Sequence, residues 1–173
     1  LYNHDDLYKK LLLLKSSKTP TILLGVTFAI LDFIEEYSLN FPELIIMETG
    51  GMKGRKKELT RPEVHNEIKL RFPSSKIHSE YGMTELFSQL YSQGNNEFSS
   101  SPWTKASVRD VTDPFNLNPK NNQGILKMID LANVDSCAFI ETEDLAKILP
   151  NGNIEILGRS DNSIQRGCNL MLK

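Results

Sequence analysis

The sequence predicts an α/β protein in which a parallel sheet with crossover helices is followed by a smaller, mainly antiparallel β lobe. In residues 1–93, short apolar runs alternate three times with segments that have helical spacing. Such alternation is typical of parallel strands joined by crossover helices. In residues 94–173, short alternating runs are separated by turns rich in Asn, Pro and Gly, which is typical of antiparallel strands. We therefore expect two lobes, divided between residues 93 and 94.

Strands and helices alternate in the first lobe after a Leu- and Lys-rich amphipathic helix. That helix covers residues 5–17. Each later strand is a short apolar run, and each later helix has apolar residues three and four positions apart. The expected strands are 21–25, 44–48 and 75–79, and the expected helices are 26–37, 62–71 and 84–91. The start at residue 62 is well marked, because Thr60 or Arg61 precedes Pro62 and an acidic Glu63.

Two glycine-containing loops follow the second and third strands of this lobe. They are Thr49-Gly50-Gly51 and Tyr81-Gly82. In parallel sheets, ligands bind at the carboxyl ends of the strands. We therefore expect both loops to contribute to one site. A basic run from Lys53 to Lys57 follows the first loop, and it is either an ordinary solvated loop or a surface that attracts phosphates or an acidic partner.

The second lobe begins with a polar, Ser-rich loop at 94–102. Its alternating runs predict short strands at 106–110, 124–131, 136–143 and 154–157. The turn at 150–153 is typical of a hairpin. Cys137 lies on one of the alternating runs, so that we expect it in the core.

Composition and charge narrow the class of protein. With 173 residues, 39% of them hydrophobic, the chain is large enough for a real core. A net charge of -2 provides no global field that would attract nucleic acid or an anionic membrane. The apolar runs are too short or too interrupted to span a bilayer, and no secretory signal is evident, so that we expect a cytoplasmic protein. Two cysteines cannot form a multi-bridge framework, and three widely separated histidines argue against a zinc site.

One polar turn carries the side chains best suited to bind a nucleotide with its metal. Tyr81 offers an aromatic face for a purine, and Gly82 lets the backbone approach a ligand closely. Thr84 supplies a hydroxyl group for a phosphate, and Glu85 supplies a carboxylate oxygen, which is the kind of ligand that Mg2+ prefers. The same residues also fit an ordinary turn followed by a helix cap.

Residues 81–85 resemble the Tyr-Gly-x-Thr-Glu motif of adenylate-forming enzymes, the superfamily of acyl-CoA synthetases and firefly luciferase. Three further segments resemble motifs of this superfamily in the same order, namely Thr49-Gly50-Gly51, Glu141-Thr142-Glu143-Asp144-Leu145 and Gly158-Arg159-Ser160-Asp161. The chain is most similar to acyl-protein synthetases, which activate a fatty acid with ATP in bacterial luminescence fatty-acid reductase complexes. Phenylacetate-CoA ligases are more distantly similar.

The resemblance implies roles for the first two matching segments. The adenine would lie against the Gly50-Gly51 loop and against Tyr81 and Gly82. Thr84 would bind the phosphates. Glu85 would hold Mg2+.

The resemblance also implies roles for the two later segments. Asp144 would accept hydrogen bonds from both ribose hydroxyl groups. Arg159 would bind the ribose or the phosphates through its planar fork of donors. This sequence has Glu143 where the family motif has Gly, which could alter the local backbone.

Cys168 is the predicted acyl acceptor. Acyl-protein synthetases carry an acyl-accepting Cys near their carboxyl end in a setting that resembles Arg166-Gly167-Cys168. A thiol can take an acyl group from an adenylate, and a neighbouring cation such as Arg166 favours the reactive thiolate. The alternative is an inert, buried Cys.

The resemblance therefore implies ATP-dependent activation of a carboxylic acid as an acyl-adenylate and transfer of the acyl group to a thiol, with Thr84, Glu85 and Cys168 as catalytic residues. ATP and Mg2+ are the implied cofactors, and a fatty or aryl carboxylic acid and an acyl-CoA reductase-like protein are the implied partners. Two alternatives stay open: a phenylacetate-type acyl-CoA ligase, and a nucleotide-binding or partner-docking module without chemistry of its own. Since the family's phosphate loop is expected upstream of residue 1 and its catalytic lysine beyond residue 173, we expect this segment to be incomplete alone.

Overall fold

The computed structural model describes residues 3–51, 59–117 and 119–160. The basic run from Lys53 to Lys57 and the residues Asp161, Arg166 and Cys168 lie outside the described residues. The chain divides into two compact units, of which the first ends at Ser79 and the second begins at Glu80. This division comes earlier in the chain than the lobe boundary expected after residue 93.

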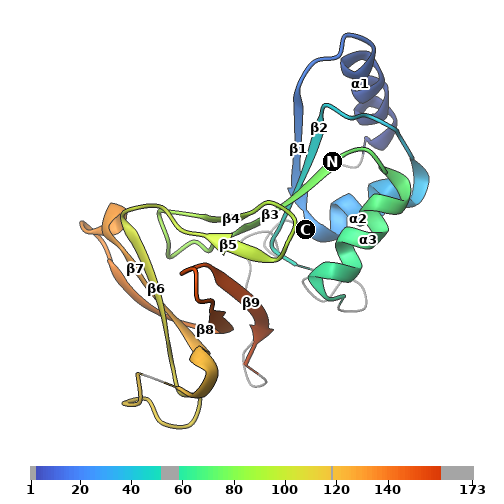
Figure 1. The fold of residues 1–173 in the computed structure, drawn as a ribbon. Helices are drawn as coiled ribbons and strands as arrows, with labels where there is room; N and C mark the ends of the chain where they lie inside the picture. The colour runs from blue at the N-terminus through green and yellow to red at the C-terminus, as the bar shows by residue number, and fades with distance from the viewer. Residues whose placement is uncertain (1–2, 52–58, 118, 161–173) are drawn as a thin grey trace. The chain divides into compact units, whose positions relative to one another are not determined.

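The first unit is an α/β arrangement in which helices connect the strands (Figure 1). Its elements are α1 (His4–Ser16), β1 (Thr21–Val26), α2 (Thr27–Glu36), β2 (Leu44–Thr49), α3 (Arg61–Arg71) and the first four residues of β3 (Lys76–Tyr81), whose last two residues belong to the second unit. β1 and β2 are parallel, with Thr21 opposite Leu44 and Val26 opposite Thr49, and β3 follows β2 in the strand order. The predicted α/β fold with crossover helices is therefore confirmed, and element types agree with the sequence prediction throughout this unit.

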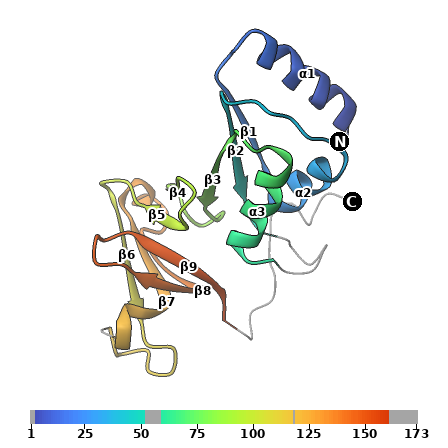
Figure 2. The ribbon, with the colours of Figure 1, turned by 45° about the vertical axis from the view of Figure 1, so that its right-hand side comes forward.

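The core of the first unit lies on the side of the sheet that α2 and α3 cover together (Figures 1 and 2). Along β2, buried and partly buried residues alternate, and Leu44 and Ile46 belong to the buried set. Phe33 of α2 and Ile68 of α3 are buried in the same cluster. Because complete burial of an apolar side chain of this size contributes about 1.5–3 kcal/mol, this layer holds both helices against the sheet.

The helices are short, and α3 has the start that the sequence predicts. The backbone N–H of Thr60 donates to Glu63 Oε2 at 2.7 Å, and the two residues form a capping box. Pro62 stands in the first turn, where its missing N–H costs no helical hydrogen bond. The longest helix in the described ranges, α1, has 13 residues, and no helix there is long and apolar enough to cross a membrane.

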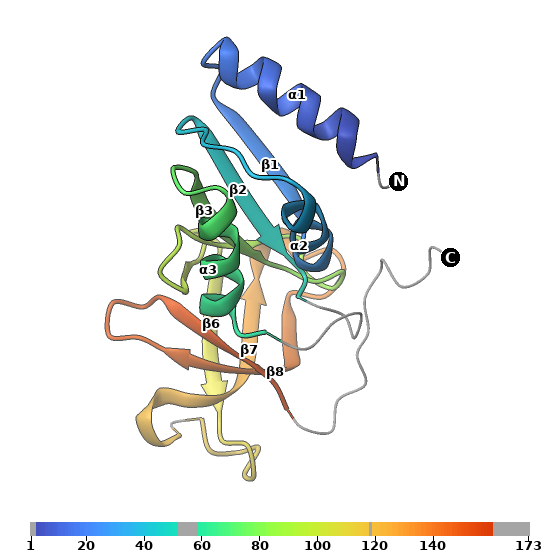
Figure 3. The same cartoon turned by 90° about the vertical axis from the view of Figure 1, so that its right-hand side faces the viewer.

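The second unit consists mainly of antiparallel strands (Figure 3). Its strands are β4 (Leu90–Ser92), β5 (Glu97–Ser99), β6 (Thr104–Arg109), β7 (Gln123–Asp130), β8 (Phe139–Ile148) and β9 (Ile154–Arg159), and its short 3-10 turns are η1 (Lys120–Asn122) and η2 (Leu131–Asn133). The strand order is β4-β5-β9-β8-β7-β6, and each neighbouring pair is antiparallel. The predicted hairpin joins β8 to β9, and the N–H of Leu149 donates to the carbonyl of Asn153 at 2.8 Å.

The helix predicted at 84–91 is wrong. Residues 84–89 form turns, and β4 begins at Leu90. The reason is the carboxylate of Asp130, which accepts hydrogen bonds from the backbone N–H groups of Phe87 at 2.9 Å and Ser88 at 2.8 Å. These donors are therefore satisfied by a side chain from the end of β7 and not by a helical turn. The apolar spacing reflects the burial of Leu86 and Leu90 in the core of the second unit. The loop expected at 94–102 likewise contains a strand, β5.

Cys137, which we expected in the core, is exposed. β8 begins only at Phe139, so that Cys137 belongs to the connection between η2 and β8. The apolar alternation that predicted its burial therefore begins after this residue. Its Sγ lies 3.4 Å from the carbonyl oxygen of Phe139.

Candidate functional site

Tyr81 and Asp144, from two different predicted motifs, are in direct contact within the second unit. The hydroxyl group of Tyr81 donates to Asp144 Oδ2 at 2.6 Å. The ring of Tyr81 packs edge-on against Phe98 with centroids 6.3 Å apart, and the residue is only 9% exposed. Burial, and then the negative charge of Asp144, raise the pKa of Tyr81, so that its hydroxyl group stays a donor. The ring assigned to purine stacking is thus mostly covered, and the hydroxyl group is the part of Tyr81 that orients a neighbouring site residue.

Arg159 lies directly across from Asp144 on the neighbouring strand. The two residues are paired in the β8–β9 register, and Arg159 Nε lies 4.0 Å from Asp144 Oδ1. The register shifts between Leu145 and Ala146, where β9 carries an extra residue, and Gly158 has a φ of 131°. Such a bulge bends a strand and turns its side chains. The hairpin therefore brings together Asp144, which is predicted to bind the ribose, and Arg159, which is predicted to bind the ribose or the phosphates.

Glu143, the departure from the family motif, does not require the backbone freedom of glycine. It lies inside β8, and it is not one of the non-glycine residues that have a positive φ angle in the described ranges. Its carboxylate forms an ion pair with Arg159. Its carbonyl oxygen accepts a hydrogen bond from the N–H of Ser160 at 2.9 Å. Glu143 thus supports the position of Arg159 opposite Asp144.

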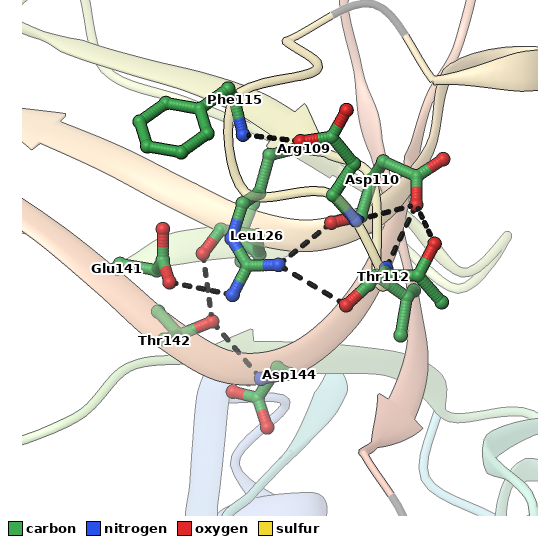
Figure 4. A network of polar contacts seen from close by, with 10 residues as sticks. Arg109, Asp110, Thr112, Phe115, Leu126, Glu141, Thr142 and Asp144 are labelled. Atoms are coloured by element: carbon green, nitrogen blue, oxygen red, sulfur yellow. Dashed lines mark hydrogen bonds and ion pairs between the residues drawn. The ribbon is translucent and has the colours of Figure 1, made fainter.

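Residues that our sequence reasoning did not single out hold β8 in place (Figure 4). The Thr142 hydroxyl group donates to the carbonyl of Leu126 at 3.0 Å and accepts from the N–H of Asp144 at 3.1 Å. Arg109 Nη2 donates to Glu141 Oε1 at 2.8 Å, which lowers the pKa of Glu141. Thr142 lies within the recognised motif and could have been noticed there, whereas nothing in the sequence marks Arg109.

Thr84 and Glu85 lie in an exposed turn. The Glu85 carbonyl oxygen accepts a hydrogen bond from Asn133 Nδ2 at 2.8 Å, so that the backbone of the turn is held by η2. In the part of the chain that the structure describes, no group of three or more His, Cys, Asp or Glu side chains is arranged to hold a metal. The assignment of Glu85 as a Mg2+ ligand stays a prediction.

Gly50 and Gly51 lie in the first unit, directly after β2. Their φ angles are +77° and +63°, a region in which residues with a side chain are strained. Among the described residues, a Cβ placed on Gly51 would meet no atom within 4 Å. A site shared by this loop and Tyr81 stays a prediction.

The second unit contains a hollow of about 430 Å³. Part of its lining, from Phe87 onward, follows the Thr84-Glu85 turn closely in sequence. Aromatic side chains of Phe87, Tyr91 and Trp103 line it, together with several serines. The ring N–H of Trp103 donates to Ser88 Oγ at 2.9 Å, and Ser88 Oγ donates to Asp130 Oδ1 at 2.8 Å. These bonds hold Trp103 at the wall of the hollow, which offers a mainly apolar surface.

No family model and no curated protein matches this chain. Solved structures do match it: ATP-bound MatB from Rhodopseudomonas palustris has a TM-score of 0.66 at 16% identity over 91% of this chain and 33% of its own. Coronafacic acid ligase from Pectobacterium brasiliense has a TM-score of 0.64 at 20% identity over 92% of this chain and 33% of its own. O-succinylbenzoate coenzyme A synthetase (MenE) from Bacillus subtilis, in complex with AMP, has a TM-score of 0.64 at 14% identity over 94% of this chain and 35% of its own. The chain thus has the fold of about one third of these proteins, and at such identities the similarity establishes the fold alone.

Proposed function

We propose that the intact protein activates a carboxylic acid with ATP as an acyl-adenylate and transfers the acyl group to a thiol. The observation that carries this proposal is the contact of Tyr81 and Arg159 with Asp144. These residues come from three separate sequence motifs of adenylate-forming enzymes, yet they lie together in one unit. The fold shared with a protein solved with ATP and a synthetase solved with AMP supports the same conclusion.

The chemistry of this cluster suits a nucleotide. The two carboxylate oxygens of Asp144 can accept hydrogen bonds from the two hydroxyl groups of a ribose. Tyr81 donates to one of these oxygens, and Arg159 approaches the other, so that the carboxylate is oriented before a ligand arrives. The planar guanidinium of Arg159 offers several donors, which suit a phosphate or a ribose oxygen.

In the proposed reaction, a carboxylate oxygen of the acid attacks the α-phosphorus of ATP and the bond to pyrophosphate breaks. The Cys168 thiolate then attacks the acyl carbon, and AMP leaves as the thioester forms. Thr84 would bind the phosphates during the first step. Mg2+ would neutralise the charge on the departing pyrophosphate, and the exposed carboxylate of Glu85 would hold it. The contribution of these residues is positioning and charge stabilisation.

The acid is proposed to have an apolar fatty or aryl group. The aromatic hollow lined by Phe87, Tyr91 and Trp103 supports this class, because it offers apolar surface from a segment that follows Thr84 and Glu85 closely in sequence. A protein thioester would require a consumer, and we propose a reductase that accepts an acyl thioester.

Pyrophosphate exchange tests the first step. In the intact protein, Glu85→Gln should abolish the pyrophosphate exchange that depends on the carboxylic acid substrate. The reason is that a metal contact made in the transition state contributes about 3–4 kcal/mol. Glu67→Gln, which alters an exposed carboxylate of α3, is the matched control and should exchange at the wild-type rate. Exchange by Glu85→Gln at the wild-type rate would remove Glu85 from the mechanism. Calorimetric binding of ATP by a wild type that shows no exchange would favour a nucleotide-binding module.

The acyl acceptor is tested by labelling. Incubation of the intact protein with ATP, Mg2+ and a labelled long-chain fatty acid, without coenzyme A, should leave a hydroxylamine-sensitive label on the protein. Cys168→Ser should lose this label and keep pyrophosphate exchange, because the adenylation residues are separate. Cys137→Ser removes an exposed thiol and should keep the label. A wild type that forms only free acyl-CoA would favour a phenylacetate-type ligase.

A further inference from the structure

A buried polar network lies in the first unit where β1 and β2 end. Thr27 opens α2 directly after β1, Glu48 is close to the end of β2, and each residue is only 2% exposed. The Thr27 hydroxyl group donates to Glu48 Oε2 at 2.7 Å. Arg61, the first residue of α3, places its Nε 3.3 Å from Glu48 Oε1. A carboxylate buried this deeply is retained only with such partners.

The network extends to β3 through His65. His65 Nε2 lies 3.8 Å from Glu48 Oε1 and 2.9 Å from Ser79 Oγ. Burial raises the pKa of Glu48, but His65, Arg61 and the hydroxyl groups of Ser79 and Thr27 lower it by more, so that its pKa lies below the ordinary value. Glu48 is therefore ionised at neutral pH. The polar network around its carboxylate links β2 to α2, α3 and β3.

The Thr27 hydroxyl group also reaches the backbone from which the glycine loop starts. It lies 3.1 Å from the carbonyl oxygen of Thr49, the last residue of β2. Gly50 and Gly51 follow with positive φ angles. Because glycine restrains its own backbone so little, the direction of this loop depends on how firmly the peptide of Thr49 is held.

A role beyond stability follows from where the network lies. A buried ion pair contributes little net stability compared with apolar side chains of similar volume. This one lies at the carboxyl ends of the strands, where α/β sheets bind ligands. We propose that Thr27 and Glu48 are positioning residues that hold the Gly50-Gly51 loop in its binding conformation before nucleotide arrives. This inference rests on the proposed function, in which that loop contacts the adenine.

The test uses Thr27→Val in the intact protein. Valine has a similar shape but lacks the hydroxyl group, so that the contacts of this group with Glu48 and with the Thr49 carbonyl, which share one hydrogen, are both lost. We expect the backbone amides of Gly50 and Gly51 to exchange hydrogen about tenfold faster without nucleotide, and the KM for ATP in pyrophosphate exchange to rise about three- to tenfold with little change in kcat. Thr27→Ser, which retains the hydroxyl group, should restore both values. If Thr27→Val does not fold, Thr27→Ala removes the same bonds with less bulk.

Ser75→Ala is the matched control. Ser75 is buried in the same unit, and its hydroxyl group donates to the carbonyl of Phe41 at 3.2 Å, ahead of the start of β3. This variant loses a comparable buried hydrogen bond that does not involve the glycine loop. It should change neither the amide hydrogen exchange of Gly50 and Gly51 nor the KM for ATP. Equal effects of Thr27→Val and Ser75→Ala would overturn the proposal, as would a Thr27→Ser protein that behaves like Thr27→Val.

The two readouts separate this proposal from the proposed function. A wild type without ATP-dependent pyrophosphate exchange would contradict the proposed function. The amide hydrogen exchange of Gly50 and Gly51 would still decide whether Thr27 holds the loop. In an active enzyme, faster hydrogen exchange in Thr27→Val with an unchanged KM for ATP would overturn the positioning role.

Discussion

The two units each bury a carboxylate near the end of a strand, and they stabilise it by different means. Glu48 of the first unit is 2% exposed and lies beside the guanidinium of Arg61 and the ring of His65. Asp130 of the second unit is 0% exposed and accepts hydrogen bonds from the backbone N–H groups of Phe87, Ser88 and Ala132 and from the Ser88 hydroxyl group. The carboxylate of Glu48 thus lies beside the cation of Arg61, and the carboxylate of Asp130 is held by neutral dipoles.

The difference has consequences for the two candidate site segments. The Glu48 network joins side chains, so that its charges can be removed together by substitution. The partners of Asp130 are mostly backbone N–H groups, which a change of side chain other than to proline leaves in place. Asp130 therefore determines the path of the chain after Thr84 and Glu85, whereas Glu48 supports a loop whose shape depends on two glycines. Four measurements would test this contrast.

Acid is expected to have the largest effect, because it removes both charges from the wild-type protein. Burial raises the pKa of both carboxyl groups, but His65 and Arg61 outweigh it for Glu48, and hydrogen bonds from Ser88 and its neighbours outweigh it for Asp130, so that both pKa values lie below the ordinary 4.5 and 3.8. The unfolded chain then binds more protons than the folded chain in acid. Stability that is fully present above these ordinary values is lost as the pH falls through the lowered ones. Urea denaturation from about pH 7 to about pH 3 should show this decline; a flat profile would contradict it.

Glu48→Gln is expected to lower the free energy of unfolding by about 3–5 kcal/mol, because it removes the buried carboxylate charge that faces the guanidinium of Arg61. The double variant with Arg61→Met should recover much of this loss, since no charge remains. Denaturant titration of the intact protein measures both. Losses that simply add in the double variant would show that the two charges are not coupled.

Asp130→Asn is expected to cost about 2–3 kcal/mol, because an amide nitrogen would face backbone N–H donors that keep no acceptor. No second substitution should rescue it, in contrast to Glu48. The fluorescence of Trp103, the only tryptophan in the chain, should also change, since its ring N–H donates to Ser88. Asp135→Asn, at an exposed carboxylate in the connection before β8, is the control and should stay within about 0.5 kcal/mol of wild type. If Asp130→Asn left the free energy of unfolding unchanged, Ser88 would be held by other contacts.

The smallest effect is expected from a matched pair of glycines, one in each unit. Gly51 and Gly152 have φ angles of +63° and +85°, and a Cβ on either would meet no atom of the residues that the structure describes within 4 Å. Gly51→Ala and Gly152→Ala should therefore each cost about 1–2 kcal/mol, from backbone strain alone. Under the proposed function, only Gly51→Ala should also weaken the binding of ATP measured by calorimetry. Equal ATP affinities in the two variants would argue against a nucleotide contact at Gly51.

The success of the sequence prediction differs between the units in a way that particular residues explain. α3 was predictable because Thr60 and Glu63 are neighbours in sequence and form its capping box directly. β1 and β2 were predictable because their apolar runs are short and follow turn residues. The segment 84–91 has similar apolar spacing, but its backbone donors bind Asp130, which lies in another part of the sequence. Cys137 was misplaced for a related reason, because only the pairing of β8 shows where that strand begins.

For the candidate site, residue types could be recognised and contacts could not. Asp144 and Arg159 belong to motifs that are visible in the chain, and the hairpin between them is predictable from its turn. That they pair across β8 and β9, and that Tyr81 donates to the same carboxylate, depends on a register and a bulge that tertiary packing decides. The links from Thr27 to Glu48 and from Ser88 to Asp130 had no local signal. Capping and periodicity act between neighbours in sequence, whereas a buried hydrogen bond depends on which distant segments the folded core brings within about 3 Å of each other.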